Sequence, residues 1–157
     1  MSQEMNQLVD SILCSNIGKR YIALCEFASV NLFSLLVLAM RIWIGKIFWY
    51  SGLAKFSDIK GAIFLFENEY RVPFINPEIA TYLAMSTELI MPFFIVVGLF
   101  SRLFAIPLLF MTIIIEFTYL DSVEHLYWGF LTGTIILYGP GKLSIDYLVY
   151  HKMLKHR

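Results

Sequence analysis

The chain contains 157 residues, of which 59% are hydrophobic, 17% aromatic and only 15% charged. A soluble domain carries about 25% charged residues, so the composition argues against an ordinary water-soluble protein and favours a membrane protein. Twelve basic and twelve acidic residues give a formal net charge of zero, which argues against a nucleic-acid partner. Cys14 and Cys25 fit neither a CxxC redox pair nor a zinc spacing, so we expect no metal site.

The first 30 residues lack the order of a signal peptide. Lys19 and Arg20 follow a polar, partly acidic run, and no small-residue cleavage site comes after them. Apolar and polar residues recur there at roughly helical spacing, which predicts an amphipathic helix on the membrane surface. A solvated tail is the alternative. Because the order of basic, apolar and small residues differs from that of a cleaved signal peptide, we expect residues 1–30 to remain attached.

Four stretches of the chain are long, apolar and nearly free of charge. A helix needs about 20 apolar residues to cross the hydrocarbon core of a bilayer, which is about 30 Å thick. We place the first span at about 31–54, and the other stretches are 79–100, 103–120 and 126–141. The sequence therefore predicts an all-α, polytopic membrane protein built as a four-transmembrane-helix bundle. We divide the chain into an amphipathic extension, a membrane domain and a basic tail, at residues 1–30, 31–150 and 151–157.

One long connection joins the first two spans, over residues 56–78. Asp58 is placed to cap a short amphipathic helix that runs to about Tyr70. Pro73 and Pro77 then mark the turn before the chain re-enters the bilayer. The sequence therefore predicts a helical first outer loop, and loops of this length often have functional roles.

Basic residues are distributed unequally between the two predicted sides of the membrane. With four spans, both termini and the second loop share one side. That side holds Lys19, Arg20, Arg102, Lys142, Lys152, Lys155 and Arg157, and the other holds Lys55, Lys60 and Arg71. The positive-inside rule then predicts that both termini are cytoplasmic.

Arg41 and Glu88 lie inside the predicted spans, where a charge at the bilayer centre costs about 2.5 to 3.5 kcal/mol. Such charges persist mainly when they are paired or functional. If the first two helices are antiparallel neighbours, both residues lie near the midplane of the bilayer. We therefore expect Arg41 and Glu88 to pair with each other.

One face of the first helix carries a set of polar and small residues. At 100° per residue they lie within an arc of about 80°; they are Arg41, Gly45, Phe48, Gly52 and Lys55. Gly45 and Gly52 permit the close approach of another helix or of a flat ligand. Lys46 lies about 140° from Arg41, which indicates a lipid-facing or interhelical lysine.

Pro92 lies four residues after Glu88 and leaves the Glu88 carbonyl without its helical hydrogen bond. This arrangement fits either a binding site or a kink that improves packing.

Further polar residues are expected toward the outer side of the membrane. Lys55, Glu116 and His125 would lie at similar depth, followed by Trp128. Together they suit proton handling beside a redox ligand. The alternative is that they are interfacial residues, an aromatic-belt tryptophan and a glutamate that joins helices. No phosphate loop, HExxH motif, Ser/His/Asp arrangement or paired-histidine haem pattern is present in the sequence, so no independent catalytic motif supports an enzyme.

Four segments of the chain together resemble the DoxX family of small four-helix bacterial membrane proteins. They are RIWIGKIFWYSGLAKF, EYRVPFINPEIATYLA, TELIMPFFIVVGLFSR and EHLYWGFLTGTIILYGPGKLSID, and the resemblance covers about residues 35–150. The residues that fall on the family's pattern are Arg41, Gly45, Gly52, Lys55, Glu88, Arg102, Gly139, Pro140 and Gly141, and His125 is common in the similar subgroup.

The resemblance implies a bacterial inner-membrane protein linked to redox metabolism. One branch of the family is the membrane subunit of a thiosulfate:quinone oxidoreductase, and another associates with superoxide dismutase and a sulfurtransferase. The sequence itself shows no motif for thiosulfate or for a metal. Gly139, Pro140 and Gly141 have a structural interpretation as the end of the fourth helix, with Asp146 capping the helix after it, and Arg102 is interpreted as a cytoplasmic anchor.

These features support three hypotheses. The leading one is a redox-associated membrane subunit that binds a quinone-like or other apolar molecule, with Arg41 and Glu88 as a polar floor and Lys55, Glu116 and His125 handling protons. Electrons would come from a soluble or membrane redox partner, and a homo-oligomer is compatible with this role. A small-solute transporter and a non-catalytic membrane scaffold for a redox complex are the alternatives.

Overall fold

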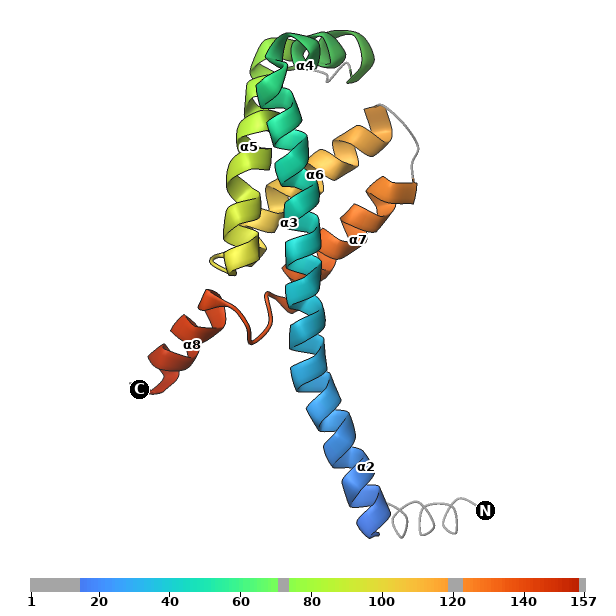
Figure 1. Cartoon of the computed structure of the whole chain (residues 1–157), viewed down its shortest axis with the longest axis vertical. Coiled ribbons are helices and arrows are strands. Elements are labelled where there is room, and N and C mark those ends of the chain that lie inside the picture. Colours follow the sequence, from blue (N-terminus) through green and yellow to red (C-terminus); the bar gives the residue numbers. More distant parts are fainter. Residues whose placement is uncertain (1–14, 71–73, 119–122, 156–157) are drawn as a thin grey trace.

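The computed structural model describes residues 15–70, 74–118 and 123–155, and within these ranges every regular element is a helix (Figure 1). The all-α prediction is confirmed for this part of the chain. The elements, with η marking π-helical turns, are α2 (Asn16–Phe27), η1 (Ala28–Leu32), α3 (Phe33–Ser57), α4 (Ile59–Leu65), η2 (Phe66–Tyr70), α5 (Pro77–Val97), α6 (Ser101–Thr118), α7 (Val123–Tyr138) and α8 (Ile145–Lys155).

Helix α2, the turn η1 and helix α3 form one continuous helical segment of 42 residues. The Ser15 side chain caps it by accepting a hydrogen bond from the Gly18 N–H. No glycine or proline interrupts residues 19–44, so nothing in the sequence ends the helix near residue 30. The predicted N-terminal helix is therefore found, but it continues into α3. Its position on a membrane surface stays a prediction, and Cys14 lies outside the described residues.

The connection after α3 is helical, as predicted. The Asp58 side chain accepts a hydrogen bond from the Gly61 N–H and so caps α4. The chain continues through η2, and Asn76 then caps α5 by accepting a hydrogen bond from the Glu78 N–H, with Pro77 in the first turn. Pro73 lies outside the described residues.

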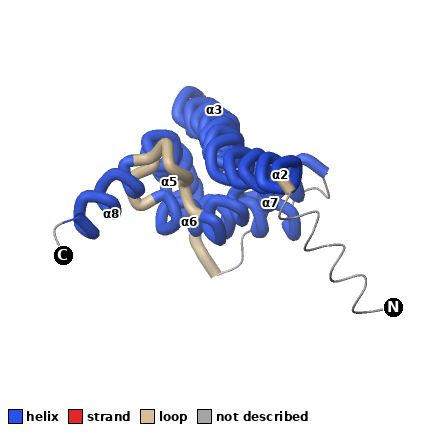
Figure 2. The backbone as a smooth tube through the Cα atoms, turned by 90° about the horizontal axis from the view of Figure 1, so that it is seen from below, coloured by secondary structure: helices blue, strands red, loops and turns tan. Residues whose placement is uncertain are grey.

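Helix α3 packs against α5, α5 against α6, α6 against α7, and α7 against α3. Seen along the continuous helical segment of α2, η1 and α3, the helices α5, α6 and α7 lie to one side of α3 (Figure 2). The side chains that fill the space between them are apolar, and the buried ones are Ile44, Phe48, Ile95, Ala105, Leu108, Leu131 and Ile135. This core holds the four helices together through burial of apolar surface and close packing.

Two described helical segments are long and apolar enough to cross a membrane, by length and composition: Asn16–Ser57 and Pro77–Val97. Helices α6 and α7 lie where the third and fourth spans were predicted and contain 18 and 16 residues. The four-span topology itself stays a prediction.

Glycines in the left-handed region mark the ends of α5 and α7. Gly98 has φ of 81° and follows α5, while Gly139 and Gly141 have φ of 86° and 76° and follow α7. L side chains are disfavoured in this region, and glycine is not. Gly139, Pro140 and Gly141 therefore end the fourth long helix, as predicted.

Candidate functional site

Lys55 of α3 and Glu88 of α5 form a buried ion pair. The Lys55 Nζ lies 2.7 Å from Glu88 Oε2 and 2.9 Å from Oε1, and it also donates to Ser51 Oγ at 2.9 Å. The Glu88 side chain is 1% exposed and that of Lys55 15%. The ammonium uses three donor directions and both carboxylate oxygens accept, so each charge keeps polar partners in apolar surroundings.

Small residues allow α3 to approach α5 closely at this pair. A Cβ added to Gly52 would lie 3.0 Å from the Glu88 Cβ, which is tighter than ordinary contact. One added to Gly45 would lie 2.5 Å from Val96 Cγ2. The two predicted glycines thus lie at the α3–α5 contact. Ser51 precedes Lys55 by four positions, which places both on the same face of α3.

A cavity of about 290 Å³ lies beside the ion pair. Apolar side chains from η2, α5 and α6 form most of its wall, among them Phe66, Leu83, Met111 and Ile115. Its polar side chains are Lys55, Thr87, Glu88 and the phenol of Tyr70. A largely apolar cavity with a few polar groups suits a small, mostly apolar molecule.

A second cavity, of about 520 Å³, adjoins the first. Lys55, Phe66 and Tyr70 line both cavities. The rings of Phe66 and Tyr70 pack edge to face with centroids 4.9 Å apart. Asp58 contributes a carboxylate to the second cavity, which is therefore the more polar of the two.

The predicted pair of Arg41 with Glu88 is wrong. Arg41 is fully buried, but its Nη2 donates to the Leu143 carbonyl, and its Nη1 is so close to Gly98 that a side chain there would overlap it. Its Nε and Nη1 have no hydrogen-bond partner among the described residues. Arg41 therefore lies at the end of α5 and not at the cavity.

The difference lies in the register of α3 against α5. Glu88 does not lie opposite Arg41 but meets α3 at Gly52. Arg41 precedes Gly52 by eleven residues, a rise of about 16 Å along the helix, which separates the Arg41 level from the Glu88 level. Lys55 lies one helical turn beyond Gly52 and is therefore the residue of α3 that reaches Glu88.

Glu116 of α6 and His125 of α7, two of the three residues expected at similar depth, form a second pair. His125 Nδ1 lies 3.1 Å from Glu116 Oε2, with side chains 12% and 17% exposed, respectively. The Trp128 ring packs edge to face on His125 at 5.1 Å and on Phe48 at 6.0 Å. Lys55 does not join this group, because its ammonium is bound to Glu88 and Ser51.

Two other residues singled out in the sequence, Pro92 and Arg102, lie at packing contacts between helices. Pro92 lies inside α5 and is buried at the contact with Gly45, which fits the packing alternative. A Cβ added to Gly139 would lie 2.9 Å from Arg102 Nη2, so Arg102 packs against the turn that ends α7.

Asp146 caps a different helix from the one predicted. Its carboxylate accepts hydrogen bonds from the Phe100 N–H at 2.7 Å and the Ser101 N–H at 3.0 Å, so it caps the start of α6. Helix α8 is capped by Ser144, which accepts from the Tyr147 N–H at 3.2 Å. Helix N-termini leave N–H groups that need acceptors, and here a distant segment supplies them.

Several residues around the cavity were not predicted from the sequence. Ser51 could have been identified as a partner of Lys55, because it lies one helical turn before it in the sequence. Phe66 and Tyr70 are separated by four positions in a segment predicted to be helical, so they could have been assigned to one face. Nothing in the sequence around Thr87 indicates a site, because it lines the cavity only through the packing of α5 against α6 and η2.

Comparison with known proteins gives one family. The family model of DoxX matches residues 36–120, which include Lys55, Glu88 and Glu116 and end before His125. No curated protein and no solved structure shows a significant match to the chain.

Proposed function

The chain belongs to the DoxX family, and from this premise we propose that it is a redox-associated membrane subunit that binds a quinone-like molecule in the cavity beside Lys55 and Glu88. Helices α3, α5, α6 and α7 form its four spans. The protein lies in the inner membrane with both termini cytoplasmic, in line with the distribution of Lys and Arg. It works with a soluble or membrane redox partner that exchanges electrons with the bound molecule.

The observation that carries this proposal is a satisfied ion pair on the wall of an apolar cavity. A quinone is a flat apolar ring with two carbonyl oxygens, and it takes up electrons and protons when reduced. When the molecule binds, the Lys55 ammonium exchanges its hydrogen bond to Ser51 Oγ for a charge-assisted one to a carbonyl oxygen. The apolar side chains of η2, α5 and α6 surround the ring, and Glu88 is within reach to accept or release a proton.

The Glu116–His125 pair extends this proton-handling role. Ile114 and Ile115 line the cavity on α6, and Glu116 is the next residue along the chain. A carboxylate paired with an imidazole at 3.1 Å provides two groups that can pass a proton between them. We assign this pair to proton exchange between the cavity and the surface.

The test uses two phenylalanine substitutions at adjacent positions of α5. Thr87 lines the cavity, whereas Ser86 is exposed and bonds to the Tyr82 carbonyl of its own helix. Thr87→Phe fills the cavity and leaves the ion pair intact, and Ser86→Phe adds the same ring outside it. The full chain, purified in mild detergent, is titrated with decylubiquinone while its unfolding temperature is followed, because a ligand of the native state stabilises it.

We expect decylubiquinone to raise the unfolding temperature of the wild type and of Ser86→Phe, but not of Thr87→Phe. Equal shifts in all three proteins would place binding outside the cavity. No shift in the wild type would refute the quinone proposal.

One observation favours a transporter as the second candidate. Two cavities meet at Lys55, Phe66 and Tyr70, and ionisable residues inside a membrane often mark a substrate pathway. A transporter reconstituted in liposomes would show solute flux that is lost in Glu88→Gln. A scaffold, the third possibility, would retain its partner complex when Lys55 and Glu88 are both replaced by leucine.

A further inference from the structure

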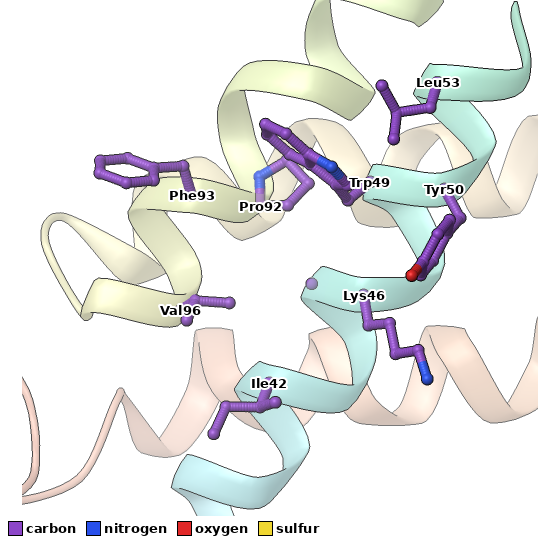
Figure 3. A pocket seen from close by; sticks show the side chains of 9 residues that line it. Ile42, Lys46, Trp49, Tyr50, Leu53, Pro92, Phe93 and Val96 are labelled. Carbon is purple, nitrogen blue, oxygen red and sulfur yellow. The ribbon is translucent and has the colours of Figure 1, made fainter.

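A groove of about 450 Å³ lies along the α3–α5 contact (Figure 3), and none of the residues that line it lines the cavity beside Lys55 and Glu88. Ile42 and Leu53 of α3 and Phe93 and Val96 of α5 form its apolar sides. Lys46 lies nine positions before Lys55, which places the two lysines on opposite faces of α3. The groove therefore belongs to the surface that faces the surrounding membrane.

Lys46 is a cation without an acidic partner in the part of the chain that the structure describes. Its Nζ lies 5.9 Å from the centre of the Tyr50 ring, and its side chain is exposed. The two acidic side chains of the predicted spans are already paired, Glu88 with Lys55 and Glu116 with His125. Charges within membrane helices are normally paired, and no described residue of the chain supplies the opposite charge for Lys46.

The position of Lys46 indicates where that charge lies. Gly45 faces Val96, and α5 ends at Val97 with the turn at Gly98. A helix that spans a membrane ends near the edge of the hydrocarbon core. Lys46 is thus near a membrane–water interface, and the neighbouring Trp49 and Tyr50 are residue types enriched at that level.

We propose that the groove binds an anionic phospholipid. One hydrocarbon chain lies along the apolar sides over Gly45, and the lipid phosphate accepts hydrogen bonds from the Lys46 ammonium and the Tyr50 hydroxyl. Figure 3 shows these two side chains next to each other on the same side of α3. A basic site between helices at the interface is the arrangement that recognises acidic headgroups. A partner helix with a carboxylate is the rival occupant, but the interfacial depth of Lys46 favours a phosphate.

The first test compares Lys46→Met with Lys142→Met. Both changes remove one exposed lysine charge, and Lys142 lies outside the groove. Binding of phosphatidylglycerol and of zwitterionic phosphatidylcholine to the purified full chain is measured by native mass spectrometry. We expect phosphatidylglycerol to bind about five-fold more weakly to Lys46→Met, with Lys142→Met and phosphatidylcholine binding unchanged. Equal loss in both variants, or no loss in Lys46→Met, would overturn the proposal.

The second test distinguishes a lipid from a protein occupant in cells. A photoreactive benzoylphenylalanine replaces Phe93, whose exposed ring borders the groove, and the crosslinked adducts are identified. A phospholipid adduct that is lost with Lys46→Met supports the proposal. A protein adduct at this position overturns it in favour of a partner helix. Neither result depends on quinone binding, because the cavity lies on the opposite face of α3.

Discussion

The Lys55 ammonium and the Glu88 carboxylate meet across the α3–α5 contact at 2.7 Å. Both charges lie beside Gly52, where the missing side chain lets the helices come close. A buried pair of this kind has two consequences: it stabilises one register of the two helices, and it presents polar groups to an otherwise apolar cavity. Substitutions at the pair and at the helix contacts separate these structural contributions from function.

Breaking the ion pair from one side should destabilise the protein strongly. Glu88→Leu leaves the Lys55 ammonium buried without a counter-charge, and Lys55→Met does the same to Glu88. We expect each single variant to lose about 3 to 5 kcal/mol of unfolding free energy. The double variant should recover most of this loss, because two apolar side chains replace two paired charges. Thermal unfolding in detergent measures the three variants, with Lys142→Met, at an exposed lysine, as the control. Additive losses in the double variant would mean that the two residues do not interact.

Gly45→Ala should destabilise the α3–α5 contact because its methyl group would overlap the Val96 side chain, at 2.5 Å from Cγ2. Overpacking of this kind typically costs about 1 to 3 kcal/mol. Val96→Ala removes the opposing methyl groups, so Gly45→Ala should cost much less in that background. A double-mutant cycle of unfolding free energies tests this coupling. An unchanged cost in the Val96→Ala background would show that the overlap is relieved elsewhere.

Two glycines near each other in the chain should respond oppositely to alanine. Gly139 has φ of 86° and packs against Arg102, so Gly139→Ala should cost at least about 1 to 2 kcal/mol. Gly133 lies inside α7 with nothing within 4 Å of an added Cβ. Gly133→Ala should therefore stabilise the protein by about 0.5 to 1 kcal/mol. Paired unfolding measurements check the signs, and the same sign for both would contradict the assigned end of α7.

Asp146→Ala should weaken the start of α6 rather than that of α8. It removes the acceptor for the Phe100 and Ser101 N–H groups, and loss of an N-cap costs about 0.5 to 2 kcal/mol. Hydrogen exchange of the backbone amides locates the effect, with faster exchange expected in the first turn of α6. Ser144→Ala is the matched control, because it removes the cap of α8. If Asp146→Ala accelerated exchange only in α8, the capping assignment would be wrong.

Helix positions and several helix ends could be predicted from the sequence. Asp58 caps the short helix that was expected there, and Gly139 and Gly141 end α7. These features depend on residues within a few positions of each other, so they are readable from local patterns. Glu116 and His125 were expected at similar depth together with Lys55, but their pairing with each other was not predicted.

The contacts between distant helices were predicted less well. Arg41 and Glu88 were both identified as intramembrane charges, but Arg41 meets Leu143 and Gly98 while Glu88 meets Lys55. Which charges pair depends on the register of α3 against α5. That register depends on where α3 begins, and no local signal ends the helix that precedes it.

The order of the amino acids was enough to establish that the chain is apolar and helical, and to identify the few charges that its spans must accommodate. The packed helices were needed to show that Lys55 is the partner of Glu88, that the cavity lies beside this pair, and that Asp146 caps α6. The physical reason is that helix formation and capping are local, whereas register results from packing between residues far apart in the chain. The eleven residues from Arg41 to Gly52 correspond to about 16 Å along α3, enough to exchange one charged partner of Glu88 for another.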